Sequence, residues 1–230
     1  MRLLVIEHET DSGSALLGKR AEEVGFTLDV RVPKDLALPP TAVGFDAILS
    51  LGASPSVNDP DAGPWLNPHL CLLRDANERG VPIFGVCFGA QALAVALGGS
   101  VTRSSTPEVG WYTVESSSPE LIENGPWLQW HVDAITPPPS AVVVATSATC
   151  VQAYTVGRHL GVQFHPEVTI DEVTSWAAGD PGGPPSAGTD AETILARFGV
   201  EFPAAVNRAN RLFDRFLRHA GLLPPAGHPQ

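Results

Sequence analysis

The stretch that decides the fold is Val81-Pro82-Ile83-Phe84-Gly85-Val86-Cys87-Phe88-Gly89. Its first six residues are apolar throughout, which is typical of a central strand in a parallel sheet with both faces covered by helices. Beyond it, apolar residues recur at the spacing of one helix face: Ala90, Leu93, Ala94 and Leu97. The pattern predicts a strand, a sharp turn at Cys87 and a helix that ends at Gly98-Gly99.

Residues 85–89 have the form Gly-x-Cys-x-Gly, which is typical of a nucleophile on a strand-turn-helix elbow. The two glycines let strand and helix approach without a Cβ collision. The thiol of Cys87 would then project at the carboxyl end of the sheet, where the helix N-terminus favours a thiolate and an oxyanion. The motif is short, and a small buried core cysteine is the alternative interpretation.

Outward from this stretch, the first hundred residues alternate between short apolar runs and helical patterns. Strands are predicted at residues 3–6, 27–32 and 47–50, and helices at 14–24 and 65–79. Further strands are predicted at 111–115, 141–145, 151–156 and 160–164, separated by turns rich in proline or glycine. The predicted fold class is α/β: a three-layer open sheet, mostly parallel, with antiparallel hairpin additions.

Length and composition predict a single domain over residues 1–220. The chain has 230 residues, of which 43% are hydrophobic, enough for one sizeable core. Residues 178–189 are rich in glycine and proline, and we expect a mobile loop there. A helical region at 190–219 should dock back on the core, and residues 221–230 should form a disordered tail.

The charge and the cysteine count exclude several classes of protein. A formal charge of -11 argues against a nucleic-acid partner, because phosphate binding depends on clustered Lys and Arg. No run approaches the roughly 18 apolar residues of a membrane span, and no export signal is recognisable, so we expect a cytoplasmic protein without membrane contact. Three cysteines without CxxC or metal-ligand spacing predict neither a disulfide framework nor a metal site.

A candidate base lies in Gly161-Val162-Gln163-Phe164-His165-Pro166-Glu167. Residues two apart in an extended chain point the same way, so Glu167 can hold one nitrogen of the His165 ring. The other nitrogen would then face a thiol. Together with Cys87, these residues form a predicted Cys-His-Glu triad.

The motifs resemble a known family. Cys87-Phe88-Gly89-Ala90-Gln91 is similar to the C-x-G-x-Q signature of class I glutamine amidotransferases, and Phe164-His165-Pro166-Glu167 resembles their F-H-P-E. Residues 51–59 stand where that family has its oxyanion strand. Residues 108–111 and 130–133 resemble the subgroup similar to the amidotransferase domain of GMP synthetase. The likeness covers roughly residues 2–175 and implies a flavodoxin-like fold.

The resemblance also implies roles for individual residues. Cys87 would attack the side-chain amide of L-glutamine to form a γ-glutamyl thioester, His165 would move the protons, and Glu167 would orient His165. The backbone N–H groups of Ala53 and Phe88 would hold the oxyanion, each donor contributing on the order of 3 kcal/mol. Four further residues would bind the substrate: Gly52, Gln91, Gly110 and Trp111. The resemblance implies no cofactor.

Two positions depart from the family pattern. Gly52-Ala53-Ser54 stands where the family usually has Gly-Gly-Pro. If the second position requires a positive φ, alanine there is strained. Val132 stands where relatives often have glycine, and the sequence does not indicate the effect.

The remaining candidates have plainer interpretations. We expect Cys71 in the core, Cys150 buried or in a turn, and structural roles for the other histidines: His8, His69, His159, His219 and His228. His131 and Asp133 either border the pocket or form a structural pair. Residues 7–9, at the end of the first strand, either touch substrate or cap that strand.

Three functions remain open. The sequence contains no phosphate-binding loop, so a glutaminase would deliver its ammonia to a separate synthetase. The same thioester chemistry could serve a γ-glutamyl peptidase acting on glutathione-like conjugates. A non-catalytic module that retained the fold is the third possibility, because fold does not guarantee function.

Overall fold

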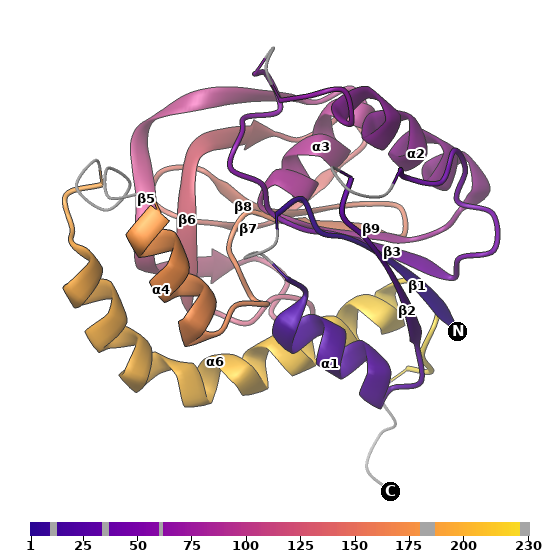
Figure 1. The fold of residues 1–230 in the computed structure, drawn as a ribbon. Coiled ribbons are helices and arrows are strands. Elements are labelled where there is room, and N and C mark those ends of the chain that lie inside the picture. Colours follow the sequence, from indigo (N-terminus) through magenta and orange to yellow (C-terminus); the bar gives the residue numbers. More distant parts are fainter. Residues whose placement is uncertain (10–12, 34–36, 60–61, 180–186, 226–230) are drawn as a thin grey trace, which may run out of the picture.

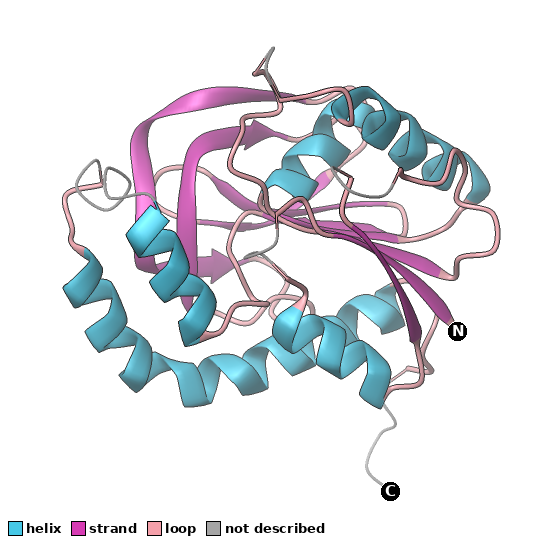
Figure 2. Ribbon diagram, viewed as in Figure 1, coloured by secondary structure: helices cyan, strands magenta, loops and turns pink. Residues whose placement is uncertain are grey.

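The computed structural model describes residues 1–9, 13–33, 37–59, 62–179 and 187–225 of the chain (Figure 1). Its strands form one nine-stranded sheet in the order β2-β1-β3-β4-β9-β8-β7-β5-β6. Figure 2 shows the helices packed on both faces of this twisted sheet. The fold is the predicted three-layer α/β arrangement.

One half of the sheet is parallel. Its strands are β1 (Arg2–Ile6), β2 (Thr27–Arg31), β3 (Ala47–Ser50), β4 (Ile83–Val86) and β9 (His159–Val162). Their order, β2-β1-β3-β4-β9, is that of flavodoxin-like folds. The strands β3, β4 and β9 are buried along their whole length, because helices cover both faces.

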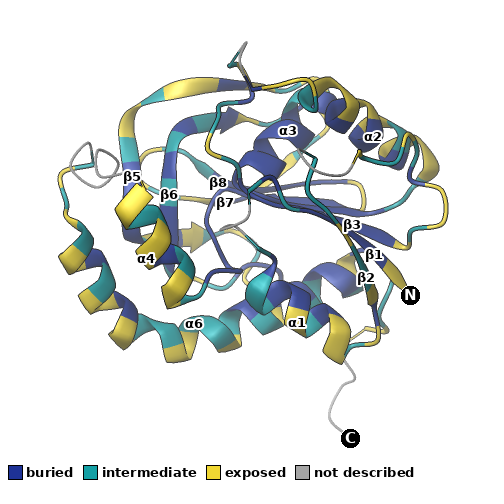
Figure 3. Ribbon diagram, viewed as in Figure 1, coloured by how far each residue is buried: buried dark blue, intermediate teal, exposed yellow. Residues whose placement is uncertain are grey.

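The helices divide between the two faces. On one side lie α2 (Leu66–Arg79) and α3 (Phe88–Ala96), and on the other lie α1 (Ala15–Glu23) and α6 (Ala191–His219) (Figure 1). Along β1, Leu3 and Val5 enter one core, whereas Leu4 and Ile6 enter the other. This is the two-residue period of a strand. Figure 3 shows the sheet as the most buried part of the molecule.

The antiparallel half is larger than predicted. It comprises β5 (Ser100–Ser116), β6 (Gly125–Thr136), β7 (Val142–Thr146) and β8 (Val151–Val156). The prediction found only residues 111–115 of β5 and missed β6. The ladder between β5 and β6 shifts register between Arg103 and Glu108, which breaks the alternation of β5. On β6, polar side chains occupy buried positions, so its hydrophobic pattern is weak: Gln129, His131 and Asp133.

Three expectations are corrected. The first concerns the loop predicted at residues 178–189. Ala178 and Gly179 belong instead to α4 (Ile170–Gly179), a helix that was not predicted, and residues 180–186 lie outside the described residues. In the predicted tail, residues 222 and 223 pack against the core, and residues 226–230 lie outside the described part. Cys71 is exposed, because the buried face of α2 runs through His69, Leu72 and Ala76.

No helix within the described ranges is long and apolar enough to cross a membrane.

Candidate active site

Cys87 lies on the predicted elbow between β4 and α3. Its backbone has φ 50° and ψ -110°, a sparsely populated conformation for a residue with a side chain. A Cβ at Gly89 would overlap the carbonyl oxygen of Ser50, and one at Gly85 would lie 2.7 Å from the backbone of Gly89. Only glycine fits at these two positions, which confirms the steric reason for the motif.

His165 and Glu167 form a buried pair directly after β9. The His165 Nδ1 lies 2.7 Å from the Glu167 Oε1. The His165 Nε2 has no hydrogen-bond partner among the described residues. Burial by itself lowers the pKa of His165, but the charge of Glu167 and that of a thiolate at Cys87 together raise this pKa well above its ordinary value.

Gly52, just beyond β3, lies between the ring and the thiol. A Cβ at Gly52 would lie 3.2 Å from the His165 Cε1 and 3.9 Å from the Cys87 Cβ. The absence of a side chain there lets the imidazole approach the elbow. The structure therefore brings the predicted triad together from two distant parts of the chain.

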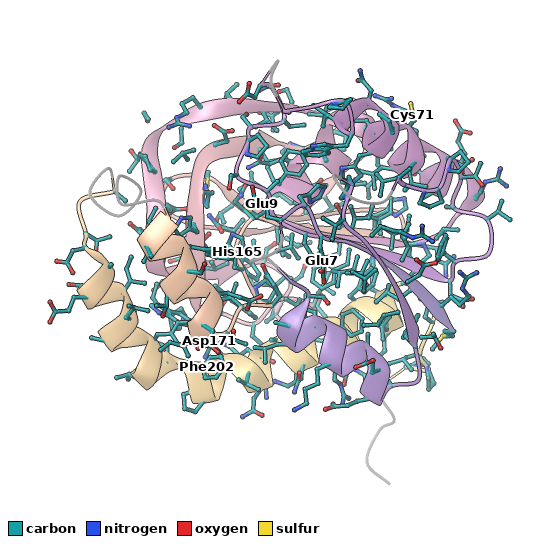
Figure 4. The ribbon with its side chains drawn as sticks, viewed as in Figure 1. Glu7, Glu9, Cys71, His165, Asp171 and Phe202 are labelled. Carbon is teal, nitrogen blue, oxygen red and sulfur yellow. The ribbon has the colours of Figure 1, made fainter. Side chains whose placement is uncertain are left out.

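Cys87 and His165 open into a cavity of about 520 Å³. Five of the predicted site residues line it: Gly52, Ala53, Cys87, Gln91 and His165. Further lining residues are Glu9, Arg103, Trp130, His131, Asp133 and Trp176. Figure 4 shows His165 and Glu9 in the region between α4 and the sheet, and Cys71 on the outer side of α2.

Two predicted substrate-binding residues do not line this cavity. Trp111 is buried against Phe198, with ring centroids 5.6 Å apart, and its carbonyl accepts a hydrogen bond from Arg197. Gly110 faces Ile194, which would lie 3.6 Å from a Cβ at this position. The neighbouring Val109 forms the wall instead. Substrate binding by Gly110 and Trp111 stays a prediction that the cavity does not support.

The expected oxyanion donors are placed without strain. Phe88 is the first residue of α3, so its N–H has no acceptor within the helix. Among the described residues other than glycine, only Ala15 and Cys87 have a positive φ. Ala53 therefore needs no conformation that disfavours alanine, and the condition for strain there is not met.

Two side chains beside Cys87 and His165 were missed from the sequence. The Gln163 Nε2 lies 3.6 Å from the Cys87 Sγ, and the Gln163 Oε1 accepts a hydrogen bond of 3.3 Å from Gln91. Trp176 of α4 packs edge-on against His165, with centroids 4.9 Å apart. Gln163 stands two residues before His165, so the period of an extended chain was a usable signal, whereas nothing local indicated Trp176.

One cluster beside the cavity has side chains that could bind a metal: Glu108, His131 and Cys150. The Glu108 Oε2 accepts hydrogen bonds from the His131 Nε2 at 3.1 Å and the Gln152 Nε2 at 2.7 Å. The same Gln152 amide lies 3.3 Å from the Cys150 sulfur. An amide N–H aimed at both ligand atoms competes with a cation, so the donor set fits a hydrogen-bond network better than a metal. His131 thus both borders the cavity and holds a structural partner.

Residues 10–175 match the family model of glutamine amidotransferase class-I. The chain belongs to this family. It is a cysteine-based amidotransferase. It spans about a third or less of the length of the curated relatives that it matches. It is 37% identical over 191 residues to the GMP synthase [glutamine-hydrolyzing] of Edwardsiella ictaluri, covering 73% of this chain and 34% of the relative. The corresponding Parafrankia enzyme is 33% identical over 168 residues, covering 68% and 30%.

Solved structures of this family have the same fold. A glutamine amido transferase from Methylobacillus flagellatus superposes with a TM-score of 0.88 at 26% identity, covering 100% of this chain and 98% of the other. A glutamine amidotransferase from Thermotoga maritima gives a TM-score of 0.84 at 25% identity, covering 94% and 98%. The flavodoxin-like amidotransferase fold predicted from the sequence is confirmed.

Proposed function

We propose that this amidotransferase hydrolyses the side-chain amide of glutamine through a γ-glutamyl thioester on Cys87. The observation that carries the proposal is the buried His165, which Glu167 holds by one ring nitrogen while the other is open beside the thiol. This arrangement performs base catalysis at a nucleophile. Cys87 and His165 both line a cavity that can admit a substrate.

Residues of this chain can supply and receive every proton that the proposed reaction moves. His165 takes the thiol proton, and the Cys87 sulfur attacks the carboxamide carbon, whose oxygen becomes an oxyanion held by the N–H groups of Ala53 and Phe88. His165 returns the proton to the leaving nitrogen, so ammonia departs and the thioester forms. His165 then deprotonates a water, which attacks the thioester carbon. The carbon–sulfur bond breaks, glutamate leaves, and the proton on His165 returns to the Cys87 sulfur.

We further propose that the ammonia serves a synthetase active site that lies outside these 230 residues. The curated relatives are named GMP synthase [glutamine-hydrolyzing], and the matching regions cover 30% and 34% of the two described above. The chain itself contains no phosphate-binding loop motif.

Release of glutamate and ammonia from glutamine tests the proposal. Cys87→Ala should lower the rate by about 10³-fold or more, because the nucleophile is lost. Cys71→Ala is the matched control: that cysteine is exposed on α2, and its loss should leave the rate unchanged. Equal rates for wild type and Cys87→Ala would refute the proposal.

The size of the cavity favours a second candidate, a γ-glutamyl peptidase. A volume of about 520 Å³ lies within the range that holds drug-sized ligands, and a peptide amine could occupy the space beside Arg103. Comparison of kcat/KM for glutamine and for γ-glutamyl dipeptides separates the two. A strong preference for glutamine would exclude the peptidase.

A further inference from the structure

Behind the oxyanion strand lies a buried chain of hydrogen bonds that the triad does not use. It joins Ser50, His69 and His8, whose exposed fractions are 0%, 0% and 1%. The Ser50 Oγ lies 3.0 Å from the His69 Nε2, and the His69 Nδ1 lies 3.4 Å from the His8 Nε2. This series of hydrogen bonds ends at the carbonyl oxygen of Gly52, which lies 3.1 Å from the His8 Nδ1.

The last acceptor, the Gly52 carbonyl, determines which group donates in each of these hydrogen bonds. A carbonyl oxygen can only accept, so the proton must be on the Nδ1 of His8. In a neutral His8 ring the Nε2 then accepts, so His69 donates from its Nδ1 and accepts from the Ser50 hydroxyl at its Nε2. The His69 ring is neutral, because burial, with a smaller contribution from a charge on His8, holds its pKa well below its ordinary value. When His8 is charged, its Nε2 donates to the His69 Nδ1 and its Nδ1 still donates to Gly52.

The acceptor belongs to the peptide unit that carries a predicted oxyanion donor. The carbonyl of Gly52 and the N–H of Ala53 share one planar trans peptide, in which the two groups point in opposite directions. Gly52 and Ala53 line the cavity. A bond that fixes the direction of the oxygen therefore also fixes the direction of the N–H.

Packing immobilises the donor. The His8 ring packs against two aromatic neighbours, with its centroid 4.8 Å from that of Trp65 and 5.0 Å from that of Phe88. Phe88 is the residue that supplies the other predicted oxyanion N–H. One aromatic cluster thus holds both sides of the predicted oxyanion site.

We propose that His8 is a positioning residue: by donating to the Gly52 carbonyl it turns the Ala53 N–H toward the oxyanion that forms at Cys87. The inference rests on the proposed thioester chemistry. It gives His8 an effect on the rate of the chemical step, whereas the sequence left open whether residues 7–9 contact substrate or only cap the first strand.

A matched pair of variants isolates this bond. In His8→Asn the amide nitrogen takes the place of Nδ1, so the bond to Gly52 is kept and the one to His69 is lost. In His8→Gln the amide takes the place of Nε2, so the bond to His69 is kept and the one to Gly52 is lost. A merely structural histidine would respond to both changes alike.

The assay is hydrolysis of γ-glutamyl p-nitroanilide, alongside glutamine, with melting temperatures recorded. His8→Gln should lower kcat by roughly 10- to 100-fold, somewhat less than loss of an oxyanion donor, with KM within about threefold of wild type. His8→Asn should keep kcat within a few fold of wild type. An unchanged kcat in His8→Gln, or equal losses in both variants, would overturn the proposal. Wild-type turnover of the anilide without glutamine hydrolysis would instead refute the proposed substrate and leave the His8 comparison valid.

Discussion

At the scale of single residues, the proposed chemistry depends on the charge of the His165 imidazole. Glu167 accepts from its Nδ1 at 2.7 Å, and the ring is buried. A buried carboxylate beside a ring stabilises the protonated form, because its charge is poorly screened there. The same ring must accept a proton from the thiol and later return it to ammonia.

Glu167→Gln should move the alkaline fall in kcat to lower pH. The carboxylate helps to raise the pKa of His165, so its removal lowers that pKa. Protonated His165, the acid that gives its proton to the leaving nitrogen, is then lost at a lower pH. We expect kcat/KM to fall by about 10²- to 10⁴-fold as orientation is lost. A pH profile of glutamate release measures both effects.

Glu172→Gln is the control for this change. Glu172 is the neighbouring carboxylate, and it accepts from the Thr169 backbone N–H at 2.7 Å rather than from the imidazole. Its variant should keep the alkaline limb of wild type. If Glu167→Gln also kept that limb, the assigned role of Glu167 would be wrong.

The sequence predicted residues in local motifs better than residues brought in by the fold. Cys87, His165 and Glu167 could be selected as candidates because turn sterics and strand period act over a few residues. Trp176 could not be found in this way, since its contact with His165 exists only once α4 has docked. Cys71 was misplaced because its apolar neighbours, Leu70 and Leu72, flank a position that points outward.

At the scale of elements, α4 and β6 supply side chains that line the cavity together with those of the elbow. Along β6 the buried positions include His131 and Asp133, which line the cavity. A strand that turns polar groups inward has no clean hydrophobic alternation, so it escaped prediction. Trp176 brings α4 against both His165 and Trp130, with centroids 4.9 Å and 5.8 Å apart.

Trp176→Ala should lower kcat/KM by roughly 10-fold. Without the covering ring, water can reach the His165 imidazole and the imidazole is held less firmly. Trp176→Phe retains an aromatic edge and should recover most of the loss. Steady-state kinetics of both variants on glutamine give the comparison. Wild-type kinetics in the alanine variant would show that α4 does not shape the site.

At the scale of the whole molecule, His159 links the parallel sheet to α2. Its Nδ1 accepts from the backbone N–H of Ile83 at 3.1 Å, and its Nε2 donates to the Asn77 Oδ1 at 3.1 Å. Burial, with smaller contributions from Arg158 and His219, lowers the pKa of His159 to about 4. The folded protein therefore holds this ring neutral.

This histidine should make the fold sensitive to acid. In the unfolded chain His159 binds its proton with a pKa of about 6.5. The stability that the neutral His159 contributes is therefore fully present above that pH and is lost as the pH falls toward 4. The slope from this group approaches about 1.4 kcal/mol per pH unit. Urea unfolding of wild type and His159→Gln between these pH values should show a shallower slope in the variant; identical slopes would contradict the assignment.

The most direct test of the central claim is the intact mass of the protein after exposure to a diazoketone analogue of glutamine. We expect one adduct, located on Cys87, together with loss of glutamate release. Cys87→Ala should gain no mass, and Cys71→Ala should label like wild type. An adduct on Cys71 or Cys150 alone, or undiminished glutamate release from labelled protein, would contradict the claim that the thiol on the elbow is the nucleophile.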